Sequence, residues 1–328
     1  MPRNVSPARR HTRRSRLLRV TAAFGVLAAL GGYLTVKYVS GSRVAEGCTV
    51  KSADGSPGQG RTYRLSPEQA SNAATISAVG TSRGMPERAV TIALATALQE
   101  SALRNIDHGD RDSLGLFQQR PSQGWGTEKQ ILDPVYSAGE FYRHLAEVPG
   151  YSRLPLTVAA QRVQRSGFPQ AYAKHEPDAA LLAAALTGRT PAALNCTPPR
   201  TTAAKADAAK VRAELVRDFG KDVLPAERPS ARRDGKGTAG ASATATATAA
   251  RTVSVPVRAA RASESDAPSR RGWELAHWAV ARSEALHLDE VAYADRVWRA
   301  GDGWRTVRTD GTDGKGPGTS EVRMGLAP

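Results

Sequence analysis

A low-complexity stretch at 235–271 limits how this chain can fold. Its sequence, GKGTAGASATATATAARTVSVPVRAARASESDAPSRR, consists mainly of Ala, Thr, Ser and Arg. Such a segment has too few large apolar side chains to offset the entropy lost on ordering. We therefore predict a linker over 199–271, helical at first and then disordered, with folded segments on either side. The low aromatic content of 5% and the 30 Gly and 20 Pro agree with modest domains joined by unstructured chain.

The N-terminus has the charge pattern of a membrane protein. Residues 1–19 contain seven Arg and no acid, and the uncharged run VTAAFGVLAALGGYLTV follows. This pattern predicts a basic cytoplasmic tail at 1–19, one transmembrane helix at 20–39 and an extracytoplasmic remainder at the cell membrane. A cleaved signal peptide is the alternative, but KYVSGSRVAEGC contains no persuasive small-residue cleavage site.

The formal net charge of +15 is spread unevenly. Residues 1–43 hold nine Lys or Arg and no acid, and residues 200–271 hold fifteen against eight acids. Residues 44–199 are nearly balanced, with fifteen against fourteen, and residues 272–328 carry seven against nine. A nucleic-acid module concentrates basic charge on a folded face. We therefore expect no nucleic-acid partner.

The two cysteines, Cys48 and Cys196, bracket most of the first folded segment. In an oxidising exterior this arrangement predicts one disulfide, with two unrelated thiols as the alternative. In the chain-entropy model, closing so long a loop stabilises the fold by on the order of 5 kcal/mol.

Between the cysteines the sequence predicts a helical domain at 63–198, after a Gly- and Ser-rich stalk at 40–62. Ser66, Pro67 and Gln69 form a capping-box pattern that begins a helix, and Gly84 and Pro86 separate it from a second helix. Further helices are expected at 133–148, 156–166 and 178–187, with no strand between Leu65 and Leu194. The expected fold class is therefore mainly α.

The last segment, 272–328, contains four of the five Trp. Its apolar spacing suits one helix followed by a small hairpin, which predicts a small C-terminal α/β module. Its tryptophans either form a surface that associates with the cell wall or fill a small core.

Glu100 stands at the end of the second helix, after the apolar stripe that includes Ala97 and Leu98. It is a surface charge, a metal ligand or a catalytic acid. Calcium binding by the loop DHGDRD at 107–112 is disfavoured, because neither register of the loop supplies the terminal bidentate acid. There is also no His/Cys cluster suited to zinc, so we expect no metal.

Glycoside cleavage needs a proton for the leaving oxygen, and a carboxyl at an apolar helix end can retain one. The following loop offers hydrogen bonds from Ser113, Gln118 and Gln119, close backbone approach at Gly115, and a ring in Trp125 that can stack on a sugar.

These residues carry a family resemblance. Glu100-Ser101, Ser113 thirteen residues after the Glu, and SLGLFQ at 113–118 resemble, in shortened form, the Glu-Ser … Ser-x-x-Gly-x-x-Gly-Leu-x-Gln pattern of the lysozyme-like soluble lytic transglycosylases. The resemblance spans about 65–190. It implies a lysozyme-like helical fold acting on peptidoglycan without a cofactor. Glu100 then takes the place of the single acid/base, and Ser113, Gly115 and Gln118 take places in the substrate loop.

In that family the Glu protonates the leaving oxygen and then removes the proton of the muramic C6 hydroxyl, which gives a 1,6-anhydro product. The family's later Tyr-Asn motif is not evident here, and Gln161 and Gln164 occupy about its position. A two-carboxylate hydrolase, with Asp107, Asp110 or Asp112 as second acid, is an alternative mechanism. A wall-binding or scaffold protein that does not cleave is the alternative function. The expected partners are peptidoglycan strands and, through the N-terminal helix, the membrane.

Overall fold

The computed structural model describes residues 47–52, 60–198, 206–225, 251–258, 267–307 and 318–328. Glu46–Pro328 form one compact unit. Its helices are α2 (Pro67–Ser82), α3 (Glu87–Ser101), α4 (Glu128–Ile131), α5 (Pro134–Ala146), α6 (Leu156–Gln164), α7 (Glu176–Leu186), α8 (Ala208–Phe219), α10 (Ala267–Ala281) and α11 (Ser283–Leu286). Its strands are β1 (Gly47–Lys51), β2 (Thr62–Leu65), β3 (Leu194–Thr197), β4 (Thr252–Pro256), β5 (Leu288–Tyr293), β6 (Arg296–Arg299), β7 (Gly303–Thr306) and β8 (Glu321–Leu326).

The predicted helix starts are confirmed. The Ser66 hydroxyl accepts the Gln69 backbone N–H at 3.1 Å, and the Gln69 side chain accepts the Ser66 N–H at 2.8 Å. Asp133 caps α5 by accepting the backbone N–H of Val135. Within 66–193, all of which the structure describes, there is no strand, only an isolated bridge between Leu114 and Gln119.

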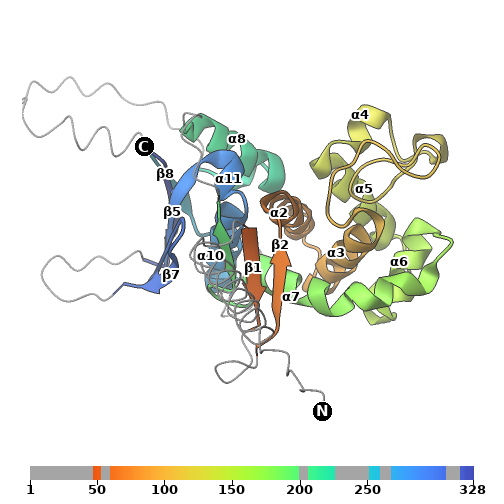
Figure 1. Cartoon of the computed structure of the whole chain (residues 1–328), viewed down its shortest axis with the longest axis horizontal. Coiled ribbons are helices and arrows are strands. Elements are labelled where there is room, and N and C mark those ends of the chain that lie inside the picture. Colours follow the sequence, from red (N-terminus) through yellow and green to blue (C-terminus); the bar gives the residue numbers. More distant parts are fainter. Residues whose placement is uncertain (1–46, 53–59, 199–205, 226–250, 259–266, 308–317) are drawn as a thin grey trace, which may run out of the picture. The chain divides into compact units, whose positions relative to one another are not determined.

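Helix α2 lies at the centre of the unit and contacts α3, α5, α7, α8 and α10 (Figure 1). Its buried side chains are nearly all small, which lets five helices approach one axis: Ala70, Ala73, Ala74, Thr75, Ile76, Ser77, Ala78, Val79 and Gly80. The closest approach is at Gly80, where an added Cβ would lie 2.6 Å from the Tyr142 hydroxyl oxygen. From Ala73 to Gly80 every residue of α2 is buried, whereas Glu68 in its first turn is exposed.

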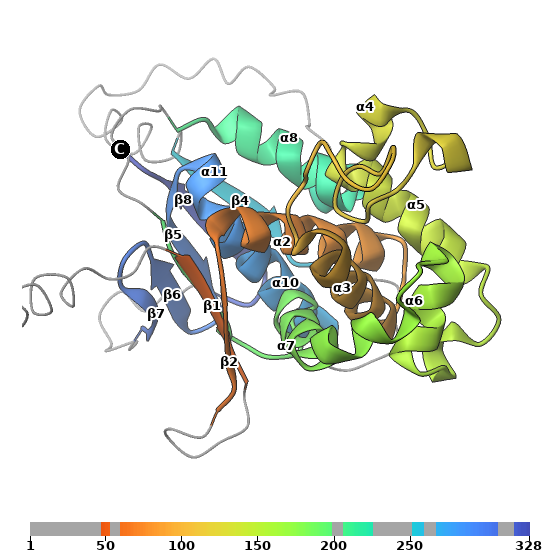
Figure 2. The same ribbon diagram turned by 45° about the vertical axis from the view of Figure 1, so that its right-hand side comes forward.

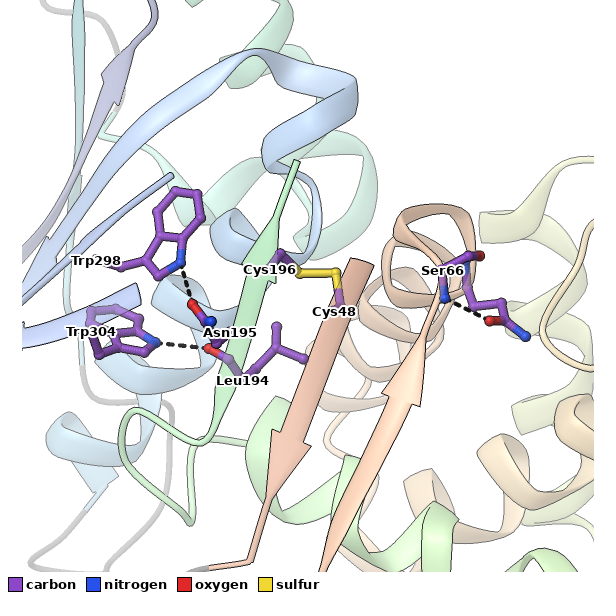
Figure 3. Close-up of a disulfide and its surroundings, with 8 residues drawn as sticks. Cys48, Ser66, Leu194, Asn195, Cys196, Trp298 and Trp304 are labelled. Carbon is purple, nitrogen blue, oxygen red and sulfur yellow. Dashed lines mark hydrogen bonds between the residues drawn. A yellow bond between two sulfur atoms is a disulfide. The ribbon is translucent and has the colours of Figure 1, made fainter. Parts of the chain in front are cut away.

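The two cysteines join the first sheet, whose strand order is β2-β1-β3 and whose neighbouring strands are antiparallel. Cys48 of β1 lies directly opposite Cys196 of β3, and their sulfur atoms form the predicted disulfide (Figure 3). Strand β1 falls in the segment predicted to be a stalk, yet Cys48 and Val50 are buried. The sequence pattern failed here because a short strand becomes stable only through its partners, which for β1 are the nearby β2 and, far along the chain, β3.

The second sheet is antiparallel, with strand order β4-β8-β5-β6-β7. Helix α10 lies between this sheet and the central helix α2 (Figure 2). Trp273, Trp278 and Trp298 are at most 4% exposed, so these tryptophans fill the core rather than forming a wall-binding surface. The indole N–H groups of Trp298 and Trp304 donate to Asn195 Oδ1 and to the Leu194 carbonyl, and so join the two sheets beside the disulfide (Figure 3).

The predicted fold class is therefore wrong. The unit has two antiparallel sheets in addition to its helices, so it is not mainly α. The C-terminal strands do not form a small α/β module of their own, since the sheet includes β4, which comes from the stretch predicted to be a linker, and packs on the helices through α10. Helix α8 lies at the start of that stretch, within the part whose composition is helical.

The structure does not support the predicted transmembrane helix. In the part of the chain that the structure describes, no helix is both long and apolar enough to span a bilayer. Residues 20–39, which were expected to form it, and the basic tail at 1–19 lie outside the described residues.

A buried ionic network holds α10 against α2 and α8. The Arg282 guanidinium donates to Asp218 at 2.7 Å, to Glu214 at 2.5 Å and to the Thr75 hydroxyl at 2.9 Å. Asp218 also accepts the Trp278 indole N–H at 2.8 Å. Removing one member of such a network leaves a buried charge without compensation, which costs about 3–5 kcal/mol. Residues more than 200 positions apart in sequence are thus held together in the core.

Helix α10 also carries a buried histidine, His277, which makes the stability of the fold depend on pH. His277 is fully buried with Nδ1 2.7 Å from the Ala185 carbonyl oxygen, and burial lowers its pKa to about 4. As the pH falls below about 6.5, the unfolded chain binds a proton that folded His277 does not accept. Stability should therefore fall between pH 6.5 and about 4, by roughly 2 to 3 kcal/mol from this residue at pH 4.5.

Urea denaturation at pH 7 and pH 4.5 measures this loss. We expect His277→Gln to lose that much less free energy of unfolding between the two pH values than the wild type. The matched control is His108→Gln, because His108 is exposed, and it should behave like the wild type. An equal pH-dependent loss in His277→Gln and in the wild type would contradict the prediction.

Candidate active site

A polar cleft with a volume of about 760 Å³ opens beside the end of α3. Its lining comes from α3, from the loop after it, from the end of α5 and from α6 with its following turn. The predicted site residues found on this lining are Glu100, Ser113, Gln118, Gln119, Trp125 and Gln164. The cleft therefore brings together six of the eight residues singled out from the sequence as catalytic or substrate-binding.

Glu100 is held in the cleft by a tyrosine. The Tyr172 hydroxyl donates a hydrogen bond of 2.6 Å to Glu100 Oε1. Among the residues described, none donates a hydrogen bond to Oε2. Burial raises the pKa of Tyr172 above its ordinary value, and the hydrogen bond to Glu100 raises it further. Tyr172 therefore remains protonated and acts as a donor, which leaves the second oxygen of Glu100 for a ligand.

The backbone directly after Glu100 has an unusual conformation. Ala102 and Leu103 have φ values of 53° and 61°, in the left-handed region that non-glycine residues rarely adopt. Two side chains of α2 hold their carbonyl groups: Gln69 Nε2 donates to Ala102 and Asn72 Nδ2 donates to Leu103, both at 2.8 Å. Strained backbone of this kind concentrates at functional sites and persists only where neighbours enforce it. The central helix thus fixes how α3 ends.

Ser101, beside Glu100, attaches the loop to the helix. Its buried hydroxyl donates to the Leu116 carbonyl at 2.8 Å. Leu116 and Phe117 are fully buried, and the Phe117 ring stacks on Phe141 with centroids 4.7 Å apart. The Glu-Ser pair and the Gly-Leu-Phe-Gln turn therefore form one structural unit, in which the serine fixes the distance between acid and loop.

The polar side chains of the loop differ in what they offer a ligand. Ser113 lines the cleft, and its hydroxyl has no hydrogen-bond partner in the described chain. Gln118 Nε2 lies 3.3 Å from the Gly115 carbonyl oxygen and 3.4 Å from that of His108. Gln119 is buried and donates to the Ser137 carbonyl at 3.0 Å. Ser113, which is 7% exposed, and the half-buried Gln118 are thus more available to a ligand than Gln119.

Two glutamines of α6 donate hydrogen bonds to backbone carbonyl groups near the cleft. Gln164 Nε2 donates to the Phe117 carbonyl at 2.7 Å and so joins α6 to the turn. Gln161 Nε2 donates to the Ser166 carbonyl at 2.8 Å and does not line the cleft. Both hold backbone groups, so their geometry suits positioning rather than direct contact with a ligand.

Trp125 lines the cleft and packs on His144, with ring centroids 4.3 Å apart. Burial and the neighbouring Arg143 lower the pKa of His144. The ring beneath Trp125 is therefore uncharged near neutral pH, which suits an aromatic surface for a sugar.

Of the three aspartates considered as a second acid, only Asp110 lines the cleft. Asp112 accepts the Ser122 backbone N–H at 2.8 Å and pairs with Arg120 at 2.6 Å; these contacts hold its pKa well below the ordinary value. Asp107 is exposed beside His108. In the described parts of the chain, no three His, Cys, Asp or Glu side chains gather in a way that suits a metal ion.

Sequence reasoning missed Tyr172, which lies behind Glu100, and several residues that line the cleft. Tyr172 lies 72 positions from Glu100 in a segment with no periodic pattern, and only its single aromatic ring within AYAKH would have drawn attention to it. Phe168 lines the cleft with 77% of its surface exposed, which is unusual for a large apolar side chain. Arg111, Arg162 and Arg165 also line it.

Comparison with known proteins adds no family to this description. No model of a protein family matches the chain, and a search of the curated proteins found no match. Its geometry is therefore the basis for assigning a function to the cleft.

Gly115 does not line the cleft, but its conformation explains why glycine stands there. Its φ is +74°, and a Cβ added there would lie 2.8 Å from the Ile131 carbonyl oxygen. Gly84 has nearly the same φ, +73°, with no atom within 4 Å of an added Cβ. Substituting each glycine by alanine therefore separates the effect of the positive φ from that of the contact between the new Cβ and the Ile131 carbonyl.

We expect Gly84→Ala to lower the free energy of unfolding by about 1 kcal/mol because of its φ alone. Gly115→Ala should lower it by at least about 1 kcal/mol more, because Ile131 has to move. Urea denaturation of the two variants measures both losses. Equal losses would show that the contact with Ile131 does not constrain the loop.

Proposed function

We propose that this chain cleaves the glycan strands of peptidoglycan, with Glu100 as the single general acid/base. The observation that carries the proposal is the hydrogen bond from Tyr172 to one oxygen of Glu100, inside an open polar cleft. A general acid has to be held within reach of the bond it protonates. Glu100 has a rigid helix behind it and a free oxygen, which fits this requirement.

The expected chemistry follows from these contacts. Protonated Glu100 donates its proton to the glycosidic oxygen as the bond to the sugar breaks. The carboxylate that results is stabilised by the Tyr172 hydroxyl, since hydrogen bonds to a charged acceptor are stronger than those to a neutral one. Glu100 then removes a proton, either from the C6 hydroxyl of the same sugar or from water. Ser113 and the ring of Trp125 are the groups expected to hold the strand.

The place of action that we propose is outside the cytoplasm. The Cys48–Cys196 disulfide supports this, because disulfides persist in oxidising compartments and are rare in the cytosol. The alternative function is binding of the wall without cleavage, in which case the cleft holds glycan and Glu100 serves only as a hydrogen-bonding group.

Glu100→Gln keeps the size of the side chain and its acceptor oxygen but removes the acid. We expect release of soluble fragments from peptidoglycan to fall by at least about a thousandfold, the upper part of the range for loss of acid–base catalysis. Quantified fragment release, with circular dichroism to verify folding, measures this. The mass of the fragments distinguishes anhydro ends from hydrolysed ends.

Asp110→Asn is the matched control, because Asp110 is the other acid on the loop side of the cleft. It should retain most of the activity if Glu100 acts alone, and a loss as large as that of Glu100→Gln would indicate a two-carboxylate mechanism. Binding of wall material without any release by the wild type would support the non-catalytic alternative instead.

Tyr172→Phe removes only the hydroxyl that holds Glu100. We expect kcat to fall by roughly ten- to a hundredfold with KM nearly unchanged, because the acid loses its orientation and the cleft keeps its shape. Tyr142→Phe is the control, since Tyr142 is also buried and its hydroxyl donates to the Ile76 carbonyl at 3.0 Å rather than to Glu100. Steady-state kinetics on solubilised strands measures both, and an unchanged kcat in Tyr172→Phe would rule out this positioning role.

A further inference from the structure

Three arginines of the cleft have no carboxylate partner. Arg111 lies on the loop after α3, while Arg162 and Arg165 lie at the end of α6, and all three side chains are exposed. In the described part of the chain, none of them forms an ion pair with Asp or Glu. Positive charge thus enters one cleft from two separate segments.

The other arginines in and beside the cleft are paired. Arg120 binds Asp112, and Arg143 bridges Glu140 and Glu147 at 2.8 and 2.9 Å. Glu147, which lines the cleft, is therefore already engaged. Exposed arginines without a carboxylate partner in the described chain also occur away from the cleft, as at Arg153 and Arg212, so Arg111, Arg162 and Arg165 are distinguished by sharing one cleft.

The turn that carries Arg165 is also fixed in place. Arg165 has a φ of 52°, and its backbone N–H donates to the Gln161 carbonyl at 2.8 Å. The side chain of Gln161 holds the Ser166 carbonyl directly after Arg165, and that of Gln164, directly before Arg165, is bonded to the Phe117 carbonyl of the loop after α3. A charged group on a constrained backbone loses less entropy on binding than one on a free loop.

Guanidinium groups bind carboxylates in pairs of parallel, charge-assisted hydrogen bonds. A polymer of N-acetylglucosamine alone carries no anion, whereas a peptidoglycan strand carries carboxylates on its lactyl groups and on its stem peptides. We propose that Arg111, Arg162 and Arg165 bind carboxylates of the peptidoglycan strand and so select an anionic strand over a neutral glycan. This inference rests on the proposed function, because it takes the glycan strand as the ligand of the cleft.

The test measures binding to the full chain carrying Glu100→Gln, which prevents cleavage during the experiment. Three fluorescently labelled ligands are compared by anisotropy: strands with stem peptides, strands stripped of peptides that keep the lactyl carboxylates, and neutral N-acetylglucosamine oligomers. Each is measured at low and at high salt, because attraction between exposed charges is screened by salt.

We expect the anionic strands to bind more tightly than the neutral oligomers, with a preference that weakens at high salt. Adding Arg162→Gln and Arg165→Gln should weaken binding of anionic strands about tenfold, the effect of losing a charge-assisted hydrogen bond, and leave the neutral oligomers unaffected. The control variant, Arg153→Gln with Arg212→Gln, removes the same charge from exposed arginines outside the cleft. It should change neither the binding of anionic strands nor that of neutral oligomers.

Tighter binding of peptide-bearing than of stripped strands assigns the stem-peptide carboxylates, and equal binding of the two assigns the lactyl carboxylates. Equal affinity for all three ligands, or an unchanged preference in the double arginine variant, would overturn the inference. Fragment release by the wild type on the same strands is measured in parallel. Its absence would refute the proposed cleavage and leave the result on carboxylate binding standing.

Discussion

Burial of α2 on all sides from Ala73 to Gly80 is the constraint on which the remainder of this fold depends. Its small side chains allow α3, α5, α7, α8 and α10 to approach, and Gly80 leaves room for Tyr142. Toward its N-terminal end α2 carries half-buried polar side chains, which also find partners inside the protein. Two of these, Gln69 and Asn72, find them on the carbonyl groups directly after Glu100. Packing at the centre therefore also determines where the acid lies.

The C-terminal segment contributes to the same arrangement from the other side of α2. Arg282 and its carboxylate partners hold α10 against α2 and α8, and the two tryptophans of the β6–β7 hairpin hold the second sheet against β3. The disulfide fixes β3 to β1 at the same place. The cleft thus lies on a body that includes residues from both ends of the described chain.

Local patterns predicted the helices well. The capping box at Ser66, the helix that begins at Asp133 and the absence of strands over 66–193 all depend on neighbours within a few residues, which the sequence displays directly. The strands β1 and β4 were missed because a short strand has little signal of its own. Part of its pairing comes from far along the chain, since β3 lies more than a hundred residues from β1 and β8 about seventy from β4.

For the candidate site, the sequence by itself determined that an acid stands at the end of an apolar helix, that Ser113, Gln118 and Trp125 follow it, and that two cysteines are available to pair. Only the tertiary structure decided which groups meet the acid. It placed Tyr172 on Glu100, turned Gln161 and Gln119 toward backbone carbonyls, and left Arg111, Arg162 and Arg165 in the cleft. The physical reason is that a helix end is specified by residues adjacent in the chain, whereas the contents of a cleft depend on segments that packing brings together.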